Sequence, residues 1–515
     1  MIREHIDKQK LFFAFLSGLI LALSFPPHGV PWFAWIALVP LFYSTRDLSF
    51  KKSFYTGLLA GLVHYIMLLY WLVATIGTYG HVPVYLCIPV LLLLSVYLAL
   101  YIGAFTASVS FLSLRPAAGL LVIPALWVCL EYIRSFILSG FPWGLIGYSQ
   151  YEYLKIIQIS DMCGVYGVSF LVVLSNTAVF LVLTKVLGND WYGRKIRNNH
   201  AAVCVLFSVL MVAGAYIYGE KRMKRIDALI KDARTIKLSV VQGNINQAIK
   251  WDRSFQRQSI NTYIRLSVSA KNKPDIIVWP ETATPFYFLY DQALTDMVKE
   301  GIFDTGSDFL IGSPSFVQKD DLIEFYNSAY LMGSKGDVYG KYDKSHLVPF
   351  GEYIPFGKYL PFLNKMVEGV GDFKSGEKGK VLQWQDLKLG IQICYEVIFP
   401  DLSAALVRND AALLINITND AWYGRSSAPY QHFSMAVFRA VENRRSLVRS
   451  ANTGISGLID PCGRVIDRTE IFNEAVITRA MPVIYKKSIY TQYGDIFAVV
   501  CVLFVVLNFI TRKNK

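Results

Sequence analysis

The chain has 515 residues, of which 54% are hydrophobic and only 17% are charged. Because a water-soluble chain of this length carries about a quarter charged residues, the composition excludes an ordinary soluble protein and indicates a membrane protein. Much of the net charge of +13 comes from Lys and Arg in short loops and tails beside apolar segments. That placement is typical of membrane topology signals, so no nucleic-acid partner is expected.

Apolar runs that approach the ~20 residues needed to cross a bilayer predict about eight transmembrane helices. The first run begins after basic residues, as a signal peptide does. No small-residue cleavage site follows it and further apolar runs come directly after, so we expect it to remain as a membrane helix. The fourth run is long enough to contain a break. The runs lie at residues 11–25, 32–44, 54–76, 84–112, 117–138, 165–186, 201–218 and 496–510.

The distribution of Lys and Arg between the short loops predicts the orientation in the membrane. Both residue types are absent from the loops at 26–31 and 78–83 but frequent in the two tails and in the loops at 46–52 and 185–197. Both termini are therefore expected in the cytoplasm. The long segment between the seventh and eighth runs is expected on the opposite, extracytoplasmic side.

From about residue 235 to residue 480, short apolar runs alternate with polar segments, which is typical of an α/β domain. Amphipathic helices are predicted at 253–269 and 431–445. Several of the strands are almost wholly apolar and should be buried on both faces. The predicted strands are 236–242, 275–279, 309–312, 328–332, 387–394, 412–417, 447–450 and 454–459. The predicted divisions are a transmembrane bundle of about seven helices, an extracytoplasmic domain, and a last helix with a basic tail, at 1–220, 221–490 and 491–515.

Three short segments at expected strand ends carry reactive side chains. Trp-Pro-Glu-Thr-Ala presents Glu281, and Tyr-Asp-Lys-Ser-His-Leu-Val-Pro-Phe-Gly-Glu-Tyr contains Lys344 and Glu352. Ile-Gln-Ile-Cys-Tyr-Glu carries a thiol, Cys394, at the end of its apolar part, followed two residues later by an acid, Glu396. Residues at the ends of buried strands are held rigidly and still remain accessible, which a reactive site requires.

These three segments resemble the Glu, Lys and Cys motifs of the nitrilase superfamily, and the second resembles its apolipoprotein N-acyltransferase branch. Gln-Gly-Asn-Ile at 242–245 with Trp251 downstream, and Asn-Asp-Ala-Trp-Tyr-Gly at 419–424, are also similar to that branch. The resemblance extends over nearly the whole chain, because the family places such a domain between seven spans and a last one. It implies an α-β-β-α sandwich and a monomer.

The chemistry of the three motifs supports a thiol nucleophile. A thiolate accepts acyl groups, and a free Cys is largely protonated at neutral pH, so a base must remove the proton. Glu281 is the carboxylate available, and the charge of Lys344 would stabilise the thiolate and then an oxyanion. The resemblance implies the backbone N–H of Tyr395 as a second oxyanion donor, with orienting or proton-relay roles for Glu352 and Glu396. No metal or nucleotide cofactor is required.

The resemblance also supplies the substrates and the location. A phospholipid, typically phosphatidylethanolamine, would donate an acyl chain to Cys394, and the α-amino group of a diacylglyceryl-cysteine apolipoprotein would accept it. The protein would lie in the cell inner (cytoplasmic) membrane with its catalytic domain in the periplasm. Trp251, Trp422 and Tyr353 are expected to bind substrate, and the apolar stretch at 356–371 is a candidate lipid-facing lid.

Two other functions stay open at this stage. A membrane-anchored amidase or nitrile hydrolase would use water as its acceptor, and a non-enzymatic domain would serve as a platform for a glycosyltransferase. A Ser-His-Asp hydrolase is disfavoured because the segment lacks a Gly-x-Ser-x-Gly motif, and His346 is expected to be structural. Cys462, in a turn-like Asp-Pro-Cys-Gly, is expected to be a bystander.

Overall fold

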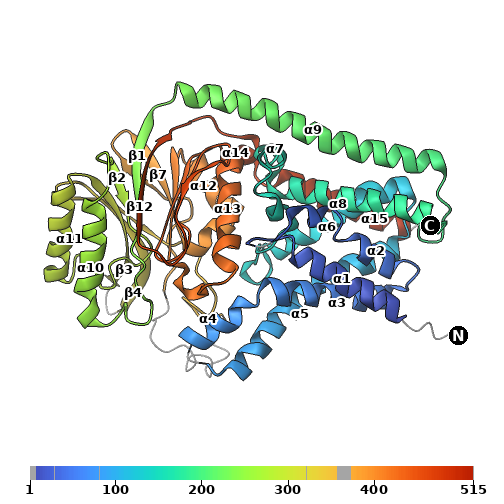
Figure 1. The fold of residues 1–515 in the computed structure, drawn as a ribbon, viewed down its shortest axis with the longest axis horizontal. Helices are drawn as coiled ribbons and strands as arrows, with labels where there is room; N and C mark the ends of the chain where they lie inside the picture. Colours follow the sequence, from blue (N-terminus) through green and yellow to red (C-terminus); the bar gives the residue numbers. More distant parts are fainter. Residues whose placement is uncertain (1–6, 28, 81, 320–321, 356–372, 514–515) are drawn as a thin grey trace. The chain divides into compact units, whose positions relative to one another are not determined.

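The computed structural model describes residues 7–27, 29–80, 82–319, 322–355 and 373–513. The chain divides into two compact units. The first, called here the helical unit, comprises Met1–Gly77, Val82–Met223 and Tyr493–Lys515; the second, the α/β unit, comprises Thr78–His81 and Lys224–Gln492. Figure 1 shows the elements of each unit.

The helical unit contains four helices, among the described residues, that are long and apolar enough to cross a membrane: α5, α6, α8 and α9. Helices α3 and α4 are bent by 53° and would make a fifth span if counted together. The eight spans predicted from the sequence are therefore not confirmed. The helices are α1 (Lys8–Ala22), η1 (Pro31–Trp35), α2 (Val39–Thr45), α3 (Phe50–Leu68), α4 (Trp71–Tyr79), α5 (Val84–Leu112), α6 (Pro116–Arg134), η2 (Ile137–Ser139), η3 (Ile146–Gln150), α7 (Leu154–Ile157), α8 (Ser160–Val186), α9 (Asn198–Lys231) and α15 (Ile496–Lys513).

The shortfall comes from the short apolar runs near the ends of the chain. Helix α1 has 15 residues, and the second run is divided between η1 and α2. Helix α15 is apolar but shorter than a full span. Helix α5, in contrast, is continuous over the whole predicted run and contains Pro89 without a break.

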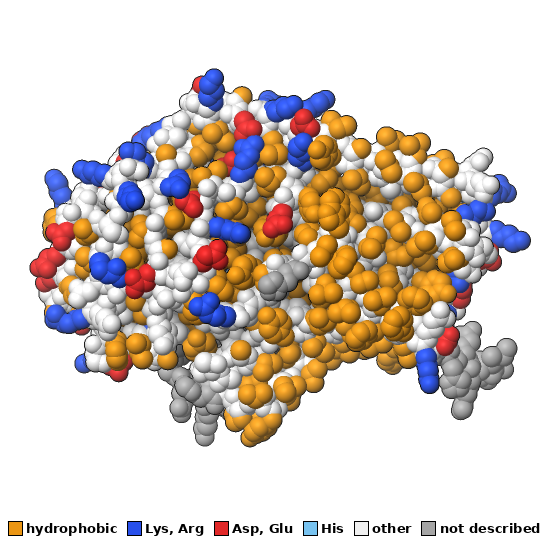
Figure 2. Space-filling view, viewed as in Figure 1, with side chains coloured by type: hydrophobic (Ala, Val, Ile, Leu, Met, Phe, Trp, Pro, Cys, Tyr) orange, Lys and Arg blue, Asp and Glu red, His pale blue; other side chains and the backbone are white. Residues whose placement is uncertain are grey.

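Close backbone approaches hold helix α3 against helix α5. A Cβ placed on Gly61 would lie 2.8 Å from the Cα of Ala99, and one placed on Gly57 would meet Thr106. Small residues of this kind let apolar helices pack at short distance, where van der Waals contact replaces the hydrophobic effect. On the face drawn in Figure 2, hydrophobic side chains cover most of the helical unit, whereas charged side chains are dispersed over the α/β unit.

The α/β unit is built on two six-stranded sheets, ordered β12-β1-β2-β3-β4-β5 and β11-β10-β9-β8-β7-β6. The strands are β1 (Thr235–Gln242), β2 (Ile276–Val278), β3 (Asp308–Lys319), β4 (Leu322–Met332), β5 (Val338–Asp343), β6 (Val381–Trp384), β7 (Leu387–Ile393), β8 (Leu413–Thr418), β9 (Leu447–Ala451), β10 (Gly457–Ile459), β11 (Val465–Arg468) and β12 (Ala475–Pro482). The helices are α10 (Arg253–Val268), α11 (Gln292–Thr305), η5 (Cys394–Ile398), α12 (Pro400–Arg408), η6 (Asp420–Tyr423), α13 (Ala428–Asn443) and α14 (Ile489–Tyr493).

The two sheets pack face to face between two helical layers (Figure 1). One core cluster joins alternate residues of both sheets, including Leu238, Leu331, Ile391 and Ile415. A second cluster joins the other face of the first sheet to helices α10 and α11. Helices α12 and α13 contact the second sheet through β7 and β9. The arrangement is a four-layered α-β-β-α sandwich, in which each sheet buries both faces.

Parallel strands determine where the reactive side chains gather. Strands β1, β2 and β3 run parallel in the first sheet, and β7, β8 and β9 run parallel in the second. Glu281 follows β2, and Cys394 follows β7. These two strands belong to different sheets, and the electrostatic interaction between Glu281 and Cys394 indicates that the ends of the two strands lie close together.

The sequence underestimated both sheets. Strands β3 and β4 form a hairpin paired from Phe309 with Met332 to Lys319 with Leu322, far longer than the predicted runs. Strands β5, β6, β11 and β12 were not predicted. Much of β5, β11 and β12 is only partly buried, so these strands lack the continuous apolar pattern that marked the central strands.

Candidate active site

Cys394 occupies a strained backbone position at the end of β7. Its φ of +53° lies in the left-handed region, which is uncommon for residues other than glycine. Burial raises the pKa of the Cys394 thiol above its ordinary value, the Glu281 carboxylate raises it further, and Lys344 opposes the shift. The resting thiol is therefore protonated at neutral pH, and a nucleophilic role would require a base to remove its proton.

Three charged side chains predicted from the sequence lie together. The Nζ of Lys344 lies 2.9 Å from both carboxylate oxygens of Glu352 and 3.8 Å from Oε1 of Glu281. Burial alone lowers the pKa of Lys344, but the carboxylates of Glu352 and Glu281 outweigh it and hold the pKa above its ordinary value. Lys344 thus remains an ammonium ion, and it interacts electrostatically with Cys394.

Asn327 on β4 joins the two carboxylates, a role that the sequence analysis missed. Its Nδ2 donates to Oε1 of Glu281 and to Oε1 of Glu352, at 2.8 Å in each case. The backbone N–H of Lys344 donates to the Asn327 carbonyl at 2.8 Å. Asn327 lies immediately before the predicted strand at 328–332, and an amide beside an apolar run was the available signal.

Glu281 is held on both its backbone and its carboxylate. Its Oε2 accepts a 2.8 Å hydrogen bond from the backbone N–H of Asn419. The buried Nζ of Lys250 donates to its carbonyl at 3.3 Å, and burial lowers the pKa of Lys250 to about 8. A Cβ on Gly312 would come within 2.7 Å of the Glu281 Cα, so only glycine fits on β3 at this point.

Glu396 links the cysteine turn to the lysine segment. Its Oε2 accepts the N–H of Ile393 at 2.6 Å, and its Oε1 accepts the N–H and the hydroxyl of Ser345, both at 2.7 Å. The Tyr342 hydroxyl donates to the same oxygen at 2.9 Å. Burial raises the pKa of Glu396, and the hydrogen bonds from Ile393 and Ser345 oppose that shift. This geometry fits an orienting role.

The predicted substrate-binding aromatics lie outside this cluster. The side chains of Trp251 and Trp422 are 50% and 37% exposed, and Tyr353 is partly buried. The Trp422 ring packs edge-on against Tyr79, with centroids 4.9 Å apart. Among the described residues, no hydrogen bond joins either tryptophan to Cys394. The candidate lid at 356–371 lies outside the described residues.

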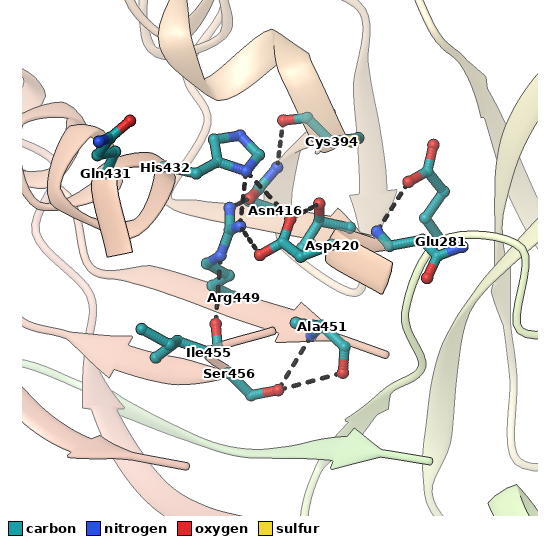
Figure 3. A network of polar contacts seen from close by, with 12 residues as sticks. Glu281, Cys394, Asn416, Asp420, Gln431, His432, Arg449, Ala451, Ile455 and Ser456 are labelled. Atoms are coloured by element: carbon teal, nitrogen blue, oxygen red, sulfur yellow. Dashed lines mark hydrogen bonds and ion pairs between the residues drawn. The ribbon is translucent and has the colours of Figure 1, made fainter. Parts of the chain in front are cut away.

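A second buried set of polar side chains lies behind Cys394, in the second sheet (Figure 3). Its members are Asn416 on β8, Asp420 on η6, His432 on α13 and Arg449 on β9, here called the buried network. The Asp420 and Arg449 side chains are both wholly buried, with Oδ2 and Nη2 2.8 Å apart. The sequence pattern predicted no role for these residues, although an arginine within the predicted strand at 447–450 was a signal.

The comparisons with known families agree with this architecture. Residues 237–485 match the family described as "Carbon-nitrogen hydrolase". The α/β unit is therefore a nitrilase-like carbon-nitrogen hydrolase domain.

Residues 17–178 match "Apolipoprotein N-acyltransferase N-terminal domain". The chain is 43% identical to an apolipoprotein N-acyltransferase from Geobacter metallireducens, over 97% of this chain and 94% of the relative. It is 32% identical to one from Rickettsia prowazekii, over 96% of each. The chain belongs to the apolipoprotein N-acyltransferase family. A solved amidase from Nesterenkonia sp. is 18% identical, with a TM-score of 0.38, covering 52% of this chain and 96% of that one.

Proposed function

We propose that this protein transfers an acyl chain from a phospholipid, through a thioester on Cys394, to the α-amino group of the N-terminal diacylglyceryl-cysteine of apolipoproteins. Membership of the apolipoprotein N-acyltransferase family supports the substrates. The observation that carries the mechanism is a buried ammonium, Lys344, held by two carboxylates and coupled electrostatically to a buried thiol.

In the first step, the carboxylate of Glu281 accepts the Sγ proton as the sulfur of Cys394 attacks the ester carbonyl carbon. Negative charge develops on the carbonyl oxygen of the ester, where the Lys344 ammonium and the Tyr395 N–H stabilise it. Breakage of the carbon–oxygen bond releases the glycerol oxygen, which takes the proton from Glu281. The products are a lysophospholipid and a thioester.

In the second step, the α-amino nitrogen of the apolipoprotein attacks the thioester carbonyl carbon. Glu281 accepts a proton from that nitrogen, the carbon–sulfur bond breaks, and the departing sulfur of Cys394 takes the proton. The product is an amide, and the free enzyme returns to its starting state. Glu352 fixes the Lys344 ammonium, Glu396 orients the cysteine turn, and the reaction has ping-pong kinetics because the donor product leaves first.

The membrane setting belongs to the same proposal. The apolar helices of the helical unit are consistent with a membrane protein. We place about eight spans in the cell inner membrane, with divisions at 1–220, 221–490 and 491–515, both termini in the cytoplasm, and the catalytic domain in the periplasm. Phosphatidylethanolamine is the proposed donor, Trp251, Trp422 and Tyr353 are proposed to bind substrate, and the protein is proposed to act as a monomer.

Mass spectrometry of the acceptor tests this function. The detergent-purified protein is incubated with phosphatidylethanolamine and a diacylated lipopeptide that bears a free α-amino group. We expect the lipopeptide to gain one acyl chain in an amide resistant to hydroxylamine, and an α-N-acetylated lipopeptide to gain none. Cys394→Ala should give no product. A lipopeptide that stays unmodified while small amides are hydrolysed would replace the acyltransferase with a membrane-anchored amidase.

A further inference from the structure

The buried network contains an ion pair that cannot meet a substrate. Asp420 and Arg449 are wholly buried, and burial of two charges is costly even when they pair. Burial raises the pKa of Asp420, but Arg449 and His432 outweigh that effect and hold the pKa well below its ordinary value. The pair is therefore ionised at neutral pH. The chemical steps proposed for Cys394 use neither member.

The hydrogen bonds of the network reach the backbone carbonyl of Cys394. Arg449 donates through Nη1 to Oδ1 of Asn416 and through Nε to the carbonyl of Ile455 at 3.2 Å. The Nδ2 of Asn416 donates to the carbonyl oxygen of Cys394 at 3.4 Å and to that of Gln392 at 3.2 Å (Figure 3). Arg449 thus fixes the amide that holds Cys394.

His432 joins the buried network from helix α13. Its Nδ1 lies 2.9 Å from Nη2 of Arg449 and 3.1 Å from Oδ1 of Asp420. Asp420 is held in turn by the hydroxyl of Thr418, which donates to its Oδ1 at 2.9 Å. The network therefore holds the backbone of Cys394 through Asn416, and His432 supports it through Arg449 and Asp420.

We propose that the buried network positions the peptide group between Cys394 and Tyr395, so that the N–H of Tyr395 faces the oxyanion formed during acyl transfer. A trans peptide group is planar, with its carbonyl oxygen and its N–H on opposite sides. Fixing the Cys394 carbonyl toward Asn416 therefore points the Tyr395 N–H the other way. This positioning role rests on the proposed thioester mechanism.

Backbone strain explains why such positioning is needed. The left-handed φ of Cys394 is unfavourable for a residue with a side chain, and it persists only where its surroundings enforce it. Without the network, relaxation of φ at Cys394 would carry the following peptide group with it and withdraw the donor. The packing around the network leaves little freedom, since a Cβ on Gly454 would come within 2.2 Å of Oδ2 of Asp420.

Acylation and alkylation of Cys394 together test whether the buried network positions the Tyr395 N–H or acts on the thiol. Acylation forms an oxyanion, whereas alkylation by iodoacetamide displaces iodide at a saturated carbon and forms none. For Asn416→Ala we expect the rate of acylation by phosphatidylethanolamine to fall about 10- to 100-fold, somewhat less than loss of a whole oxyanion donor costs. The alkylation rate and its pH profile should stay within about threefold of the wild type, because the thiol itself is unchanged.

Asn443→Ala is the matched control. Asn443 is also a buried asparagine, and its Nδ2 donates to the Arg439 carbonyl at 3.0 Å, within helix α13. We expect a similar loss of thermal stability and unchanged rates in both reactions. Should Asn416→Ala fail to fold, Arg449→Lys serves instead, because it keeps the charge beside Asp420 and loses the planar fork that bonds Asn416 and Ile455.

Equal losses in acylation and alkylation would overturn the proposal, since the network would then act on the thiol. Unchanged acylation in a folded Asn416→Ala would overturn it as well. A p-nitrophenyl ester is assayed in parallel as a second acyl donor. If the wild type accepts that ester but not the phospholipid, the proposed function fails while the effect of the network on acylation is still measured.

Discussion

Two buried ion-pair clusters of the α/β unit, one beside each sheet, differ in their exposure. In the first sheet, Lys344 pairs with Glu281 and Glu352, whose side chains keep 8% and 11% of their exposure. In the second sheet, Arg449 pairs with Asp420 and both are wholly buried. Similar chemistry thus serves two purposes: a cluster that keeps slight access is suited to meet a reactant, whereas a sealed one can only hold protein atoms.

The cations of the two clusters, Lys344 and Arg449, also differ in what they can contact. Lys344 is a compact charge near two carboxylates, so part of its field remains available to a developing oxyanion. Arg449 directs its planar fork at Asn416, Asp420 and Ile455, which fixes several groups at once. The comparison predicts that variants of the first cluster change the chemistry itself, whereas variants of the second change geometry.

The largest effect is expected from Lys344→Met. Loss of the ammonium removes an oxyanion donor and leaves Glu281 and Glu352 facing each other, so acylation of Cys394 should fall about a thousandfold or more. Lys341→Met is the control, because Lys341 pairs with Asp343 on the same strand at 3.1 Å and is partly exposed. Rapid-quench measurement of acylation should show little change in the control. Comparable losses in both variants would argue for a general effect of charge.

Glu281→Gln should separate the two reactions of Cys394 in opposite directions. The base is lost, so acylation should fall about 10²- to 10⁴-fold. The Glu281 charge raises the pKa of the thiol, so its removal should lower that pKa and increase the thiolate fraction. Alkylation by iodoacetamide at pH 8 should therefore become faster, with its pH profile moved toward lower pH. Slower alkylation would show that Glu281 does not face the thiol.

Gly312→Ala tests how firmly Glu281 must be placed. The added methyl would meet the backbone of Pro280 and Glu281, and the displacement should reduce acylation about tenfold, because misplacement of a reacting group is costly. Gly214→Ala is the control, since nothing lies within 4 Å of a Cβ at Gly214. Steady-state kinetics with phosphatidylethanolamine compare the two. A variant with wild-type kcat would indicate that Glu281 tolerates displacement.

The smallest effect is expected from an exposed ion pair of the same unit. Arg464 and Asp227 lie 2.6 Å apart with substantial exposure, and such pairs contribute about 0 to 1 kcal/mol. Asp227→Asn should therefore change the melting temperature slightly and leave both reactions unchanged. Thermal unfolding in detergent measures this. A large loss would mean that exposure is a poor guide to the role of ion pairs in this unit.

The sequence marked the residues proposed to react more readily than the residues that contact them. Glu281, Lys344 and Cys394 stand beside Pro, Gly and aromatic residues at the ends of apolar strands, so the pattern marks them. Asn327 and Asn416 are neutral amides in or beside strands, and their partners are distant in sequence. Only the pairing of the strands brings them to the carboxylates and to the Cys394 carbonyl.

The number of spans stays a prediction, because the described helices do not correspond one to one with the apolar runs. Hydropathy recognises an apolar run but not whether the run forms one helix. The apolar stretch at 54–76 is bent between α3 and α4, and the stretch at 32–44 is divided between η1 and α2. Proline does not mark the breaks either. Pro40 lies in the first turn of α2, and Pro89 lies inside the continuous helix α5. Packing against neighbouring helices determines these outcomes, and a single run of residues does not encode it.

Intact-mass analysis of the purified protein tests the central claim most directly. After incubation with phosphatidylethanolamine and no acceptor, we expect the wild type to gain the mass of one acyl chain. Hydroxylamine should remove that chain, and Cys394→Ala should not gain it. An adduct that resists hydroxylamine, an adduct on Cys394→Ala, or no adduct from any phospholipid would contradict a thioester on Cys394.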